Sequence, residues 1–229
     1  MSGNEAADQL IAEGNRAETA GALQKACDLY RRAVASAPRY ARAHLNLGIG
    51  LEALGDAAGA AACYESALAL DAADPFSGYN LGKLLYARGE LPRARQLLEQ
   101  ALRHRADFPD ARIVLAYVLQ AQGELAAAAA ELKTALPQRP ADFIARAALF
   151  HILEAQGDLA AAAAQLEAVL RDKPDWTEAV YNYGRTLMRL ERDAEAEAAL
   201  RRVLALDPGF VLAYRMLGNL LHRQGRVDE

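Results

Sequence analysis

The sequence repeats itself every 34 residues, and this period constrains the fold more than any other feature. Small residues recur at one position of the period, with one large exception: Gly14, Gly48, Gly82, Ala116, Phe150, Gly184 and Gly218. A second position holds glycine in all repeats but one: Gly21, Gly55, Gly89, Gly123, Gly157, Glu191 and Gly225. A third holds only alanine: Ala26, Ala60, Ala94, Ala128, Ala162 and Ala196. No insertion or deletion disturbs this register over residues 7–229, which indicates one structural unit stacked many times.

The second position, the turn glycine, predicts where the first helix of each repeat ends. Glycine adopts the left-handed conformation just past a helix without a Cβ penalty. The residue that follows the glycine is often acidic: Asp56, Glu90, Glu124 and Asp158. Aspartate can cap the N-terminus of a second helix directly, and glutamate at least suits the positive end of its dipole. Proline then recurs where the second helix must stop, because the residue before proline avoids helical geometry: Pro38, Pro140, Pro174 and Pro208. Each repeat is therefore predicted to be a pair of helices.

The first position, the small-residue position, lies inside the first helix, where glycine costs roughly 1 kcal/mol relative to alanine. We expect this cost to be offset by close approach of the first helix to the alanine position of the second. Large apolar residues recur at two further positions: Leu47, Leu81, Leu115, Leu149 and Leu217, and Leu68, Leu102, Leu136, Leu170 and Leu204. One helix pair cannot bury these side chains alone, whereas stacked pairs can.

Composition and charge exclude several classes of function. Hydrophobic residues make up 53% of the chain but aromatic residues only 7%, so the alanine-rich chain favours helices over one deep core. The net charge of −4 provides no basic field for nucleic acid or anionic lipid. Residues 1–10 lack the apolar core of a secretory signal, and no apolar run is long enough to insert into a membrane. Cys27 and Cys63 are interpreted as free thiols in a reducing compartment, which predicts a cytoplasmic protein.

The pattern resembles the tetratricopeptide repeat (TPR), for example in Ala43-His44-Leu45-Asn46-Leu47-Gly48 followed by Gly55, Asp56, Ala60, Tyr64 and Ala67. After a short N-terminal tail at 1–6, the resemblance covers six repeats and the first helix of a seventh: 7–40, 41–74, 75–108, 109–142, 143–176, 177–210 and 211–229. It implies a single array, an all-α, right-handed superhelical solenoid of antiparallel helix pairs. First helices would line a concave groove, and second helices would face outward. The array is also similar to bacterial-type arrays that precede O-GlcNAc-transferase-like enzymes.

The resemblance places peptide binding on first-helix side chains that are not used for packing. The predicted groove residues are Asn46, Ile49, Phe76, Tyr79, Asn80, Lys83, Tyr86, Ile113, Tyr117, His151, Tyr181, Asn182, Arg185, Arg189 and Arg215. Their tyrosines are amphipathic aromatics of the kind that enriches binding surfaces. Their three arginines make the C-terminal part of the groove basic, which suits an acidic partner segment or is simply a solvated face.

Asn46, Asn80 and Asn182 share one position of the period. In O-GlcNAc transferases, which the array resembles, asparagines at this position hydrogen-bond the backbone of an extended peptide. A side-chain amide offers both a donor and an acceptor for that contact. Asparagine is also common there in the family for packing reasons, so both roles stay open. The resemblance does not extend to chaperone-tail receptors, whose basic clamp residues are replaced by Ile11 and Phe76 among others.

Phe150 is the large exception at the small-residue position, and two interpretations are open. The following helix contains an unusually empty stretch at 160–164, which could receive the ring by volume compensation. Alternatively, the ring forces a local splay of helices that opens a pocket beside His151.

No constellation of residues predicts catalysis. His151 and Glu154 lie about one helical turn apart, but no third partner accompanies them. The two cysteines lack the spacing of a zinc site, and no serine lies in a nucleophile elbow. The chain is therefore expected to bind no metal and no cofactor and not to be an enzyme.

The expected function is a protein–protein interaction scaffold that binds a partner peptide or helix in its groove. An alternative is the non-catalytic, substrate-recruiting region of a larger bacterial glycosyltransferase or similar transferase. The sequence stops at Glu229, one residue before the next alanine position, so we expect an array that continues in a longer protein. An open apolar edge around Leu217, Leu220 and Leu221 would then allow self-association.

Overall fold

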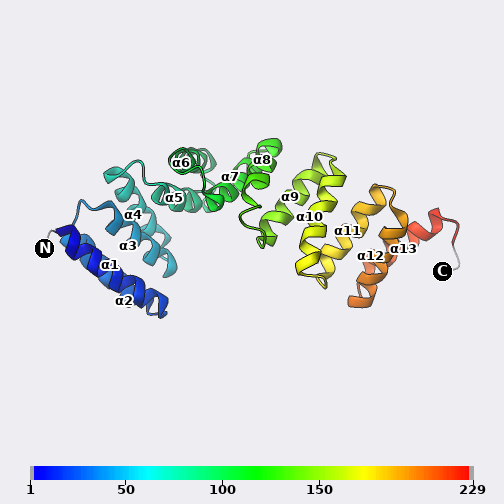
Figure 1. Ribbon diagram of the computed structural model, residues 1–229, viewed down its shortest axis with the longest axis horizontal. Helices are drawn as coiled ribbons and strands as arrows, with labels where there is room; N and C mark the ends of the chain where they lie inside the picture. Colours follow the sequence, from blue (N-terminus) through cyan, green and yellow to red (C-terminus); the bar gives the residue numbers. More distant parts are fainter. Residues whose placement is uncertain (1–2, 227–229) are drawn as a thin grey trace. The chain divides into compact units, whose positions relative to one another are not determined.

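The computed structural model describes residues 3–226, and every regular element in that range is an α-helix (Figure 1). The helices form two compact units, Met1–Gln122 (unit 1) and Gly123–Glu229 (unit 2). Unit 1 contains α1 Gly3–Thr19, α2 Leu23–Ser36, α3 Ala41–Ala53, α4 Ala57–Leu70, α5 Pro75–Ala87, α6 Leu91–His104 and α7 Pro109–Ala121. Unit 2 contains α8 Leu125–Ala135, α9 Phe143–Ala155, α10 Leu159–Asp172, α11 Thr177–Arg189, α12 Asp193–Leu206 and α13 Val211–Arg223.

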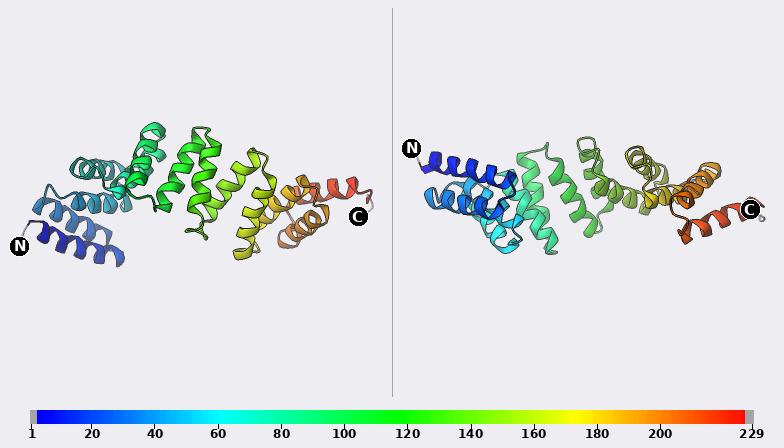
Figure 2. Two further views of the ribbon diagram at one scale, coloured as in Figure 1. Left: turned by 45° about the horizontal axis from the view of Figure 1, so that its top comes forward. Right: turned by 90° about the horizontal axis from the view of Figure 1, so that it is seen from below.

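Within each unit, successive helices run antiparallel and pack as stacked pairs (Figure 2). In unit 1, α1 packs on α2, α3 on α4 and α5 on α6, and in unit 2, α9 packs on α10 and α11 on α12. The predicted all-α stack of helix pairs is thereby confirmed. α1 begins at Gly3, so the segment expected as a tail contributes to the first helix. Among the described residues no helix has the length and apolar character to cross a membrane.

The turns after the first helices have the predicted geometry. All six turn glycines have positive φ, between 75° and 84°. Glu191, at the same position, has φ 58° and is the only non-glycine residue of the described chain with positive φ. After α3, Gly55 N–H donates to Glu52 O and Asp56 N–H to Leu51 O, both at 2.9 Å. This pair of bonds satisfies two carbonyls that the helix end leaves open, as in a Schellman motif.

Capping of the second helices follows the predicted difference between Asp and Glu. Asp56 Oδ1 accepts from Gly59 N–H at 2.8 Å, and Asp158 Oδ1 accepts from Ala161 N–H at 3.1 Å. Glu90 and Glu124 precede α6 and α8 without a side-chain cap bond. The shorter aspartate reaches the open N–H groups directly, whereas glutamate contributes only its charge near the helix dipole.

At Gly48 and Gly82, the small-residue position comes closest to a larger residue that follows the predicted alanine, and at Gly82 the alanine position is also near, with Ala94 O 3.3 Å from a Cβ. A Cβ on Gly48 would lie 2.5 Å from the Tyr64 ring, and one on Gly82 would lie 2.9 Å from Leu98 Cγ. Tyr64 and Leu98 stand one turn beyond the alanine position, whose members are fully buried. Helical side chains lean toward the N-terminus, so the larger residue reaches back over the alanine and occupies the space above it. Glycine therefore accommodates the ring of Tyr64 at one repeat and the side chain of Leu98 at the next, rather than only a neighbouring alanine.

α8 is the shortest of the described helices, because Pro137 interrupts it. The other second helices have 14 residues, but α8 has 11 and ends at Ala135. Leu136 keeps helical dihedral angles and its N–H donates to Leu132 O at 2.9 Å, but Pro137 has no N–H with which to continue the helix. The proline at the predicted position, Pro140, therefore follows a helix that has already stopped.

The expectation of an open edge around Leu217, Leu220 and Leu221 is wrong. All three leucines are buried and belong to the core cluster that α13 forms with α11 and α12. They point onto the preceding helix pair, so the exposed apolar side chains of α13 are others, chiefly Val211 and Tyr214.

Candidate functional site

In each unit the first helices retain a side that their second helices leave partly exposed, which we call the first-helix face. It comprises α1, α3, α5 and α7 in unit 1, and α9, α11 and α13 in unit 2. Fourteen of the fifteen predicted groove residues lie there as half-buried or exposed side chains. The exception is Ile113, which is only 6% exposed and packs into the core of unit 1.

Aromatic side chains of α5 and α7 form a cluster on the first-helix face of unit 1. Tyr86 stacks on Tyr117 with ring centroids 6.3 Å apart. The rings of Tyr79 and Phe76 both approach Phe108, at 4.9 Å and 5.5 Å, and Phe76 remains 43% exposed. We call Phe76, Tyr79, Tyr86 and Tyr117 the aromatic surface. Rings held by their neighbours provide large contact area at low cost in conformational entropy, as binding surfaces require.

A charged network fixes Lys83 beside the aromatic surface. Lys83 Nζ lies 2.7 Å from Glu52 Oε1 and 5.8 Å from the centroid of the Tyr79 ring. Glu52 Oε2 also accepts a hydrogen bond of 2.9 Å from the hydroxyl of Tyr64, the buried ring above Gly48. Burial, together with the adjacent Glu52, raises the pKa of Tyr64, which keeps its hydroxyl a neutral donor. The charge of Lys83 is therefore balanced.

The three predicted asparagines differ in what their amides do. Asn46 Nδ2 donates to the backbone oxygen of Arg42 at 2.8 Å, so its donor is used within its own helix. The side-chain amides of Asn80 and Asn182 form no hydrogen bond with residues 3–226. Each of these two can offer a donor and an acceptor to a ligand. The asparagine position is thus suited to peptide contact at one site in each unit.

The predicted basic part of the face is largely ion-paired. Arg185 Nη2 donates to both carboxylate oxygens of Glu154 at 2.8 Å, and Arg189 Nη1 donates to Glu154 Oε1 at 2.8 Å. Two guanidinium groups on one carboxylate leave a net charge of +1 for the three residues. Arg215 is exposed and forms no ion pair within the described chain. Because Glu154 is held by arginines, it does not form an acid–base pair with His151.

Phe150 shows elements of both interpretations. Its ring is buried, and Ala162 and Ala163 in the empty stretch of α10 are buried as well, as volume compensation requires. However, the ring does not fill all the space between α9, α10 and α11. A pocket of about 290 Å³ opens at this place. We call it the Phe150 pocket, lined mainly by Ala147, Phe150, His151, Leu166, Trp176 and Asn182.

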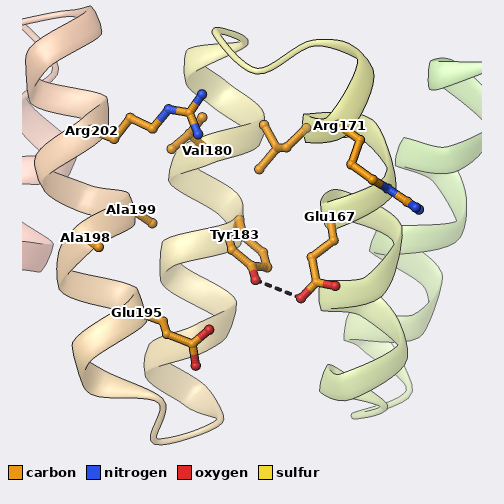
Figure 3. Close-up of a pocket in the computed structure, with 9 residues that line it drawn as sticks. Glu167, Arg171, Val180, Tyr183, Glu195, Ala198, Ala199 and Arg202 are labelled. Carbon is orange, nitrogen blue, oxygen red and sulfur yellow. Dashed lines mark hydrogen bonds between the residues drawn. The ribbon is translucent and has the colours of Figure 1, made fainter.

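A wider cleft of about 670 Å³ lies on the other side of unit 2, between the second helices α10 and α12 (Figure 3). Tyr183 points toward α10, and its hydroxyl donates to Glu167 Oε1 at 2.7 Å. Burial and this bond raise the pKa of Tyr183 to about 12. Glu195 is paired with Arg192 at 2.7 Å, and Arg202 donates to Pro174 O at 2.7 Å. Most polar groups of the cleft thus have partners already, which makes it the weaker candidate for ligand binding.

The described residues offer little for catalysis or metal binding. Within residues 3–226, no group of three or more His, Cys, Asp or Glu side chains is arranged to hold a metal ion. Cys27 is buried and Cys63 half-buried, and burial raises the pKa of both thiols. A protonated thiol is a poor nucleophile.

Sequence reasoning missed the aromatic residues that precede the first helices. Phe108 supports Tyr79 at 4.9 Å in unit 1, and Phe210 supports Tyr181 at 5.0 Å in unit 2, with similar ring tilts of 50° and 46°. The two pairs occupy equivalent positions of the period, and Trp176 of the Phe150 pocket shares the position of Phe108 and Phe210. The signal was therefore present in the repeat, as an aromatic residue just before several first helices. Tyr183 also had a signal, because it replaces leucine at one of the two leucine positions.

Comparison with known proteins agrees with this architecture. Two family models, both described as tetratricopeptide repeat, match the chain, one over residues 85–149 and the other over 11–76, 147–210 and 194–229. The search of curated proteins finds no match.

Solved structures with the same fold include several repeat proteins. YrrB, described as a TPR protein with an unusual peptide-binding site, is 25% identical with a TM-score of 0.72, over 82% of this chain and 96% of that one. PilF of Pseudomonas aeruginosa is 20% identical with a TM-score of 0.76, over 96% and 99% of the two chains. The first TPR domain of Spaghetti (RPAP3), bound to an HSP90 peptide, is 22% identical with a TM-score of 0.50, over 52% and 95%.

Proposed function

Because the chain belongs to the tetratricopeptide repeat family, we propose that it is a protein-interaction scaffold that holds an extended segment of a partner polypeptide. The contact surface is the first-helix face, and in unit 1 it centres on the aromatic surface. The observation that carries the proposal is this partly exposed cluster of four rings, held in place by Phe108 and by the Lys83–Glu52 pair.

The chemistry of unit 1 suits a peptide of ordinary composition. The free amide of Asn80 can bond a peptide group, which every sequence provides. The tyrosines can pack on aliphatic or aromatic side chains while their hydroxyls remain at the polar rim. Since Lys83 is already paired with Glu52, the surface demands no strongly acidic partner. The similarity to YrrB, whose description names a peptide-binding site, supports the same class of ligand.

The proposal is tested with peptides selected against the protein itself. A library of random heptapeptides is selected on the immobilised wild-type chain, and affinities of the selected peptides are measured by fluorescence anisotropy. Loss of an aromatic anchor typically costs on the order of 2 kcal/mol, so Tyr79→Ala with Tyr117→Ala is expected to weaken binding about 30-fold or more. Asn80→Ala is expected to weaken it by about a factor of ten or less, because one hydrogen bond is lost.

Two controls separate binding from folding. Tyr214→Ala makes the same substitution at an exposed tyrosine of α13 that is not a predicted groove residue, because its equivalent in α11, Val180, packs into the core. This variant is expected to leave affinity unchanged. Circular dichroism of each variant must show wild-type helicity. If the double variant keeps helicity and binds the selected peptides as tightly as wild type, the aromatic surface is not the binding site.

The alternative of a substrate-recruiting region of a transferase rests on the asparagine position. The series is partial, because Val114 and Ala148 occupy the equivalent positions between Asn80 and Asn182, and because the donor of Asn46 is bonded within its own helix. An interaction scaffold needs no such series, and we adopt it as the function. In this reading the chain itself performs no chemistry and uses no cofactor.

A further inference from the structure

The Phe150 pocket offers depth beside the partly exposed first-helix face of unit 2. It lies where a phenylalanine occupies a position at which the other repeats have glycine or alanine. Its lining comes from α9, α10, α11 and Trp176, so the buried ring does not fill the whole space between these helices. The volume of about 290 Å³ is more enclosed than the outer cleft of unit 2.

Most of the lining of the pocket is apolar, although Glu178 adds a carboxylate. Leu166 and Val169 of α10 contribute to it together with the rings of Phe150 and Trp176. Ile144 also lines the pocket and is 76% exposed, which is unusual for a large aliphatic side chain. Ligand pockets begin at about 300 Å³, so this one suits a single large side chain rather than a whole small molecule.

The lining of the pocket also includes polar groups that suit a peptide. The free amide of Asn182 lies at the lining and can bond the backbone of the residue whose side chain enters. Further along α11, Arg185 and Arg189 share Glu154, and the three residues together keep a charge of +1. Glu178 also lines the pocket and disfavours an acidic ligand group near the start of α11. A carboxylate of the ligand is therefore favoured only toward Arg185 and Arg189.

We propose that the Phe150 pocket binds a large apolar side chain of an extended partner segment, with an acidic residue of that segment on the Arg185–Arg189 side. This inference rests on the proposed function and specifies its ligand in unit 2. The spacing follows from helix and strand geometry. Arg185 is three residues beyond Asn182 and Arg189 seven, or about 4.5 Å and 10.5 Å along the helix axis. An acidic residue two positions from the anchor in an extended chain is displaced by about 6.6 Å, within this range.

Trp176 makes the proposal directly testable, because it is the only tryptophan of the chain and lines the pocket. The probes are synthetic peptides with blocked ends, Ser-Gly-Leu-Ser-Asp-Gly-Ser and two relatives in which leucine is replaced by alanine or aspartate by asparagine. Titration of the leucine peptide is expected to change the Trp176 emission saturably. Burial of a leucine side chain predicts about ten-fold weaker binding of the alanine peptide. The asparagine peptide is expected to bind about three-fold more weakly and to lose the salt dependence of the parent.

A matched pair of protein variants locates the binding event. Ala147→Leu places a side chain inside the pocket and is expected to weaken the leucine peptide at least ten-fold. Ala155→Leu makes the same change at an exposed position of the same helix outside the pocket, and it is expected to have no effect. The comparison of leucine and alanine peptides needs no variant, so it remains decisive if Ala147→Leu fails to fold.

The outcomes separate this inference from the proposed function. The pocket proposal is overturned if the leucine and alanine peptides bind with equal affinity, or if well-folded Ala147→Leu binds the leucine peptide as tightly as wild type. Either result counts against the pocket even if the Tyr79–Tyr117 double variant no longer binds the selected peptides. A leucine-dependent Trp176 signal that Ala147→Leu abolishes supports the pocket, even if that double variant binds selected peptides normally and the aromatic surface is refuted.

Discussion

Replacing Glu191 by glycine should stabilise unit 2, because Glu191 is the one residue with a side chain at a left-handed turn position. Its φ is 58°, whereas the six turn glycines have φ between 75° and 84°. The left-handed conformation costs a residue with a Cβ roughly 1–2 kcal/mol. Glycine in turn lowers the free energy of unfolding by about 0.5–1 kcal/mol relative to alanine, because its unfolded chain has more conformational entropy to lose on folding. The difference predicts a net gain of about 0.5–1 kcal/mol for Glu191→Gly.

The assay is equilibrium urea denaturation followed by Trp176 fluorescence, which reports on unit 2 alone. The midpoint of Glu191→Gly is expected to rise while the slope with urea stays constant, since the surface exposed on unfolding is the same. Glu191→Ala removes the carboxylate but keeps the Cβ, so it should unfold close to wild type. The reasoning is refuted if Glu191→Gly unfolds at or below the wild-type midpoint, or if Glu191→Ala gives the same gain.

Three further predictions concern packing, pH and charge. Gly48→Ala should destabilise unit 1 by about 1–3 kcal/mol, because the new Cβ would lie 2.5 Å from the Tyr64 ring. Gly218→Ala should not destabilise unit 2, because no atom lies within 4 Å of the new Cβ. Urea denaturation followed by circular dichroism distinguishes the two variants. The folded pKa of Tyr183, about 12, exceeds the ordinary value of 10.0, so its contribution to stability is complete below pH 10 and is lost as pH rises toward 12. Tyr183→Phe should therefore flatten this alkaline loss in Trp176-monitored denaturation, and an unchanged pH profile would contradict the assignment. Glu154→Gln should free Arg185 and Arg189 and strengthen binding of the aspartate-containing probe several-fold, but not of the asparagine probe, in the Trp176 titration.

Most of the fold could be predicted because its determinants are local and recur in register. A turn glycine needs only its own φ, and an aspartate cap reaches an N–H three residues away, as Asp56 does with Gly59. Such features are fully specified by short segments, so the 34-residue period located each helix pair.

The partner of the small-residue position could not be assigned in the same way. Whether Gly48 faces Ala60 or Tyr64 depends on how far a side chain leans along the second helix, which the period does not specify. The shortening of α8 did have a local cause in Pro137, but the recurring proline at Pro140 directed attention three residues too far.

The sequence predicted the exposure of most candidate site residues but not the interactions among them. Groove residues follow from their phase on the first helices, and most of them are indeed partly exposed. The pairing of Glu154 with Arg185 and Arg189 joins residues 31 and 35 apart in the sequence. These separations differ from the period by three residues and by one, so contacts of this kind could be sought by comparing charges on consecutive first helices. The depth of the Phe150 pocket depends on how the side chains of α9, α10 and α11 fill the space between them, which no spacing in the sequence encodes.

The central claim is that the first-helix faces bind peptide, and hydrogen–deuterium exchange tests it most directly. Exchange of the free chain is compared with that of the chain saturated with a heptapeptide selected on it. The account predicts slower exchange in the first helices α3, α5 and α7, or α9 and α11, with the second helices α4, α6 and α10 unchanged. Protection confined to the second helices, including α10 and α12 on either side of the outer cleft, would contradict it.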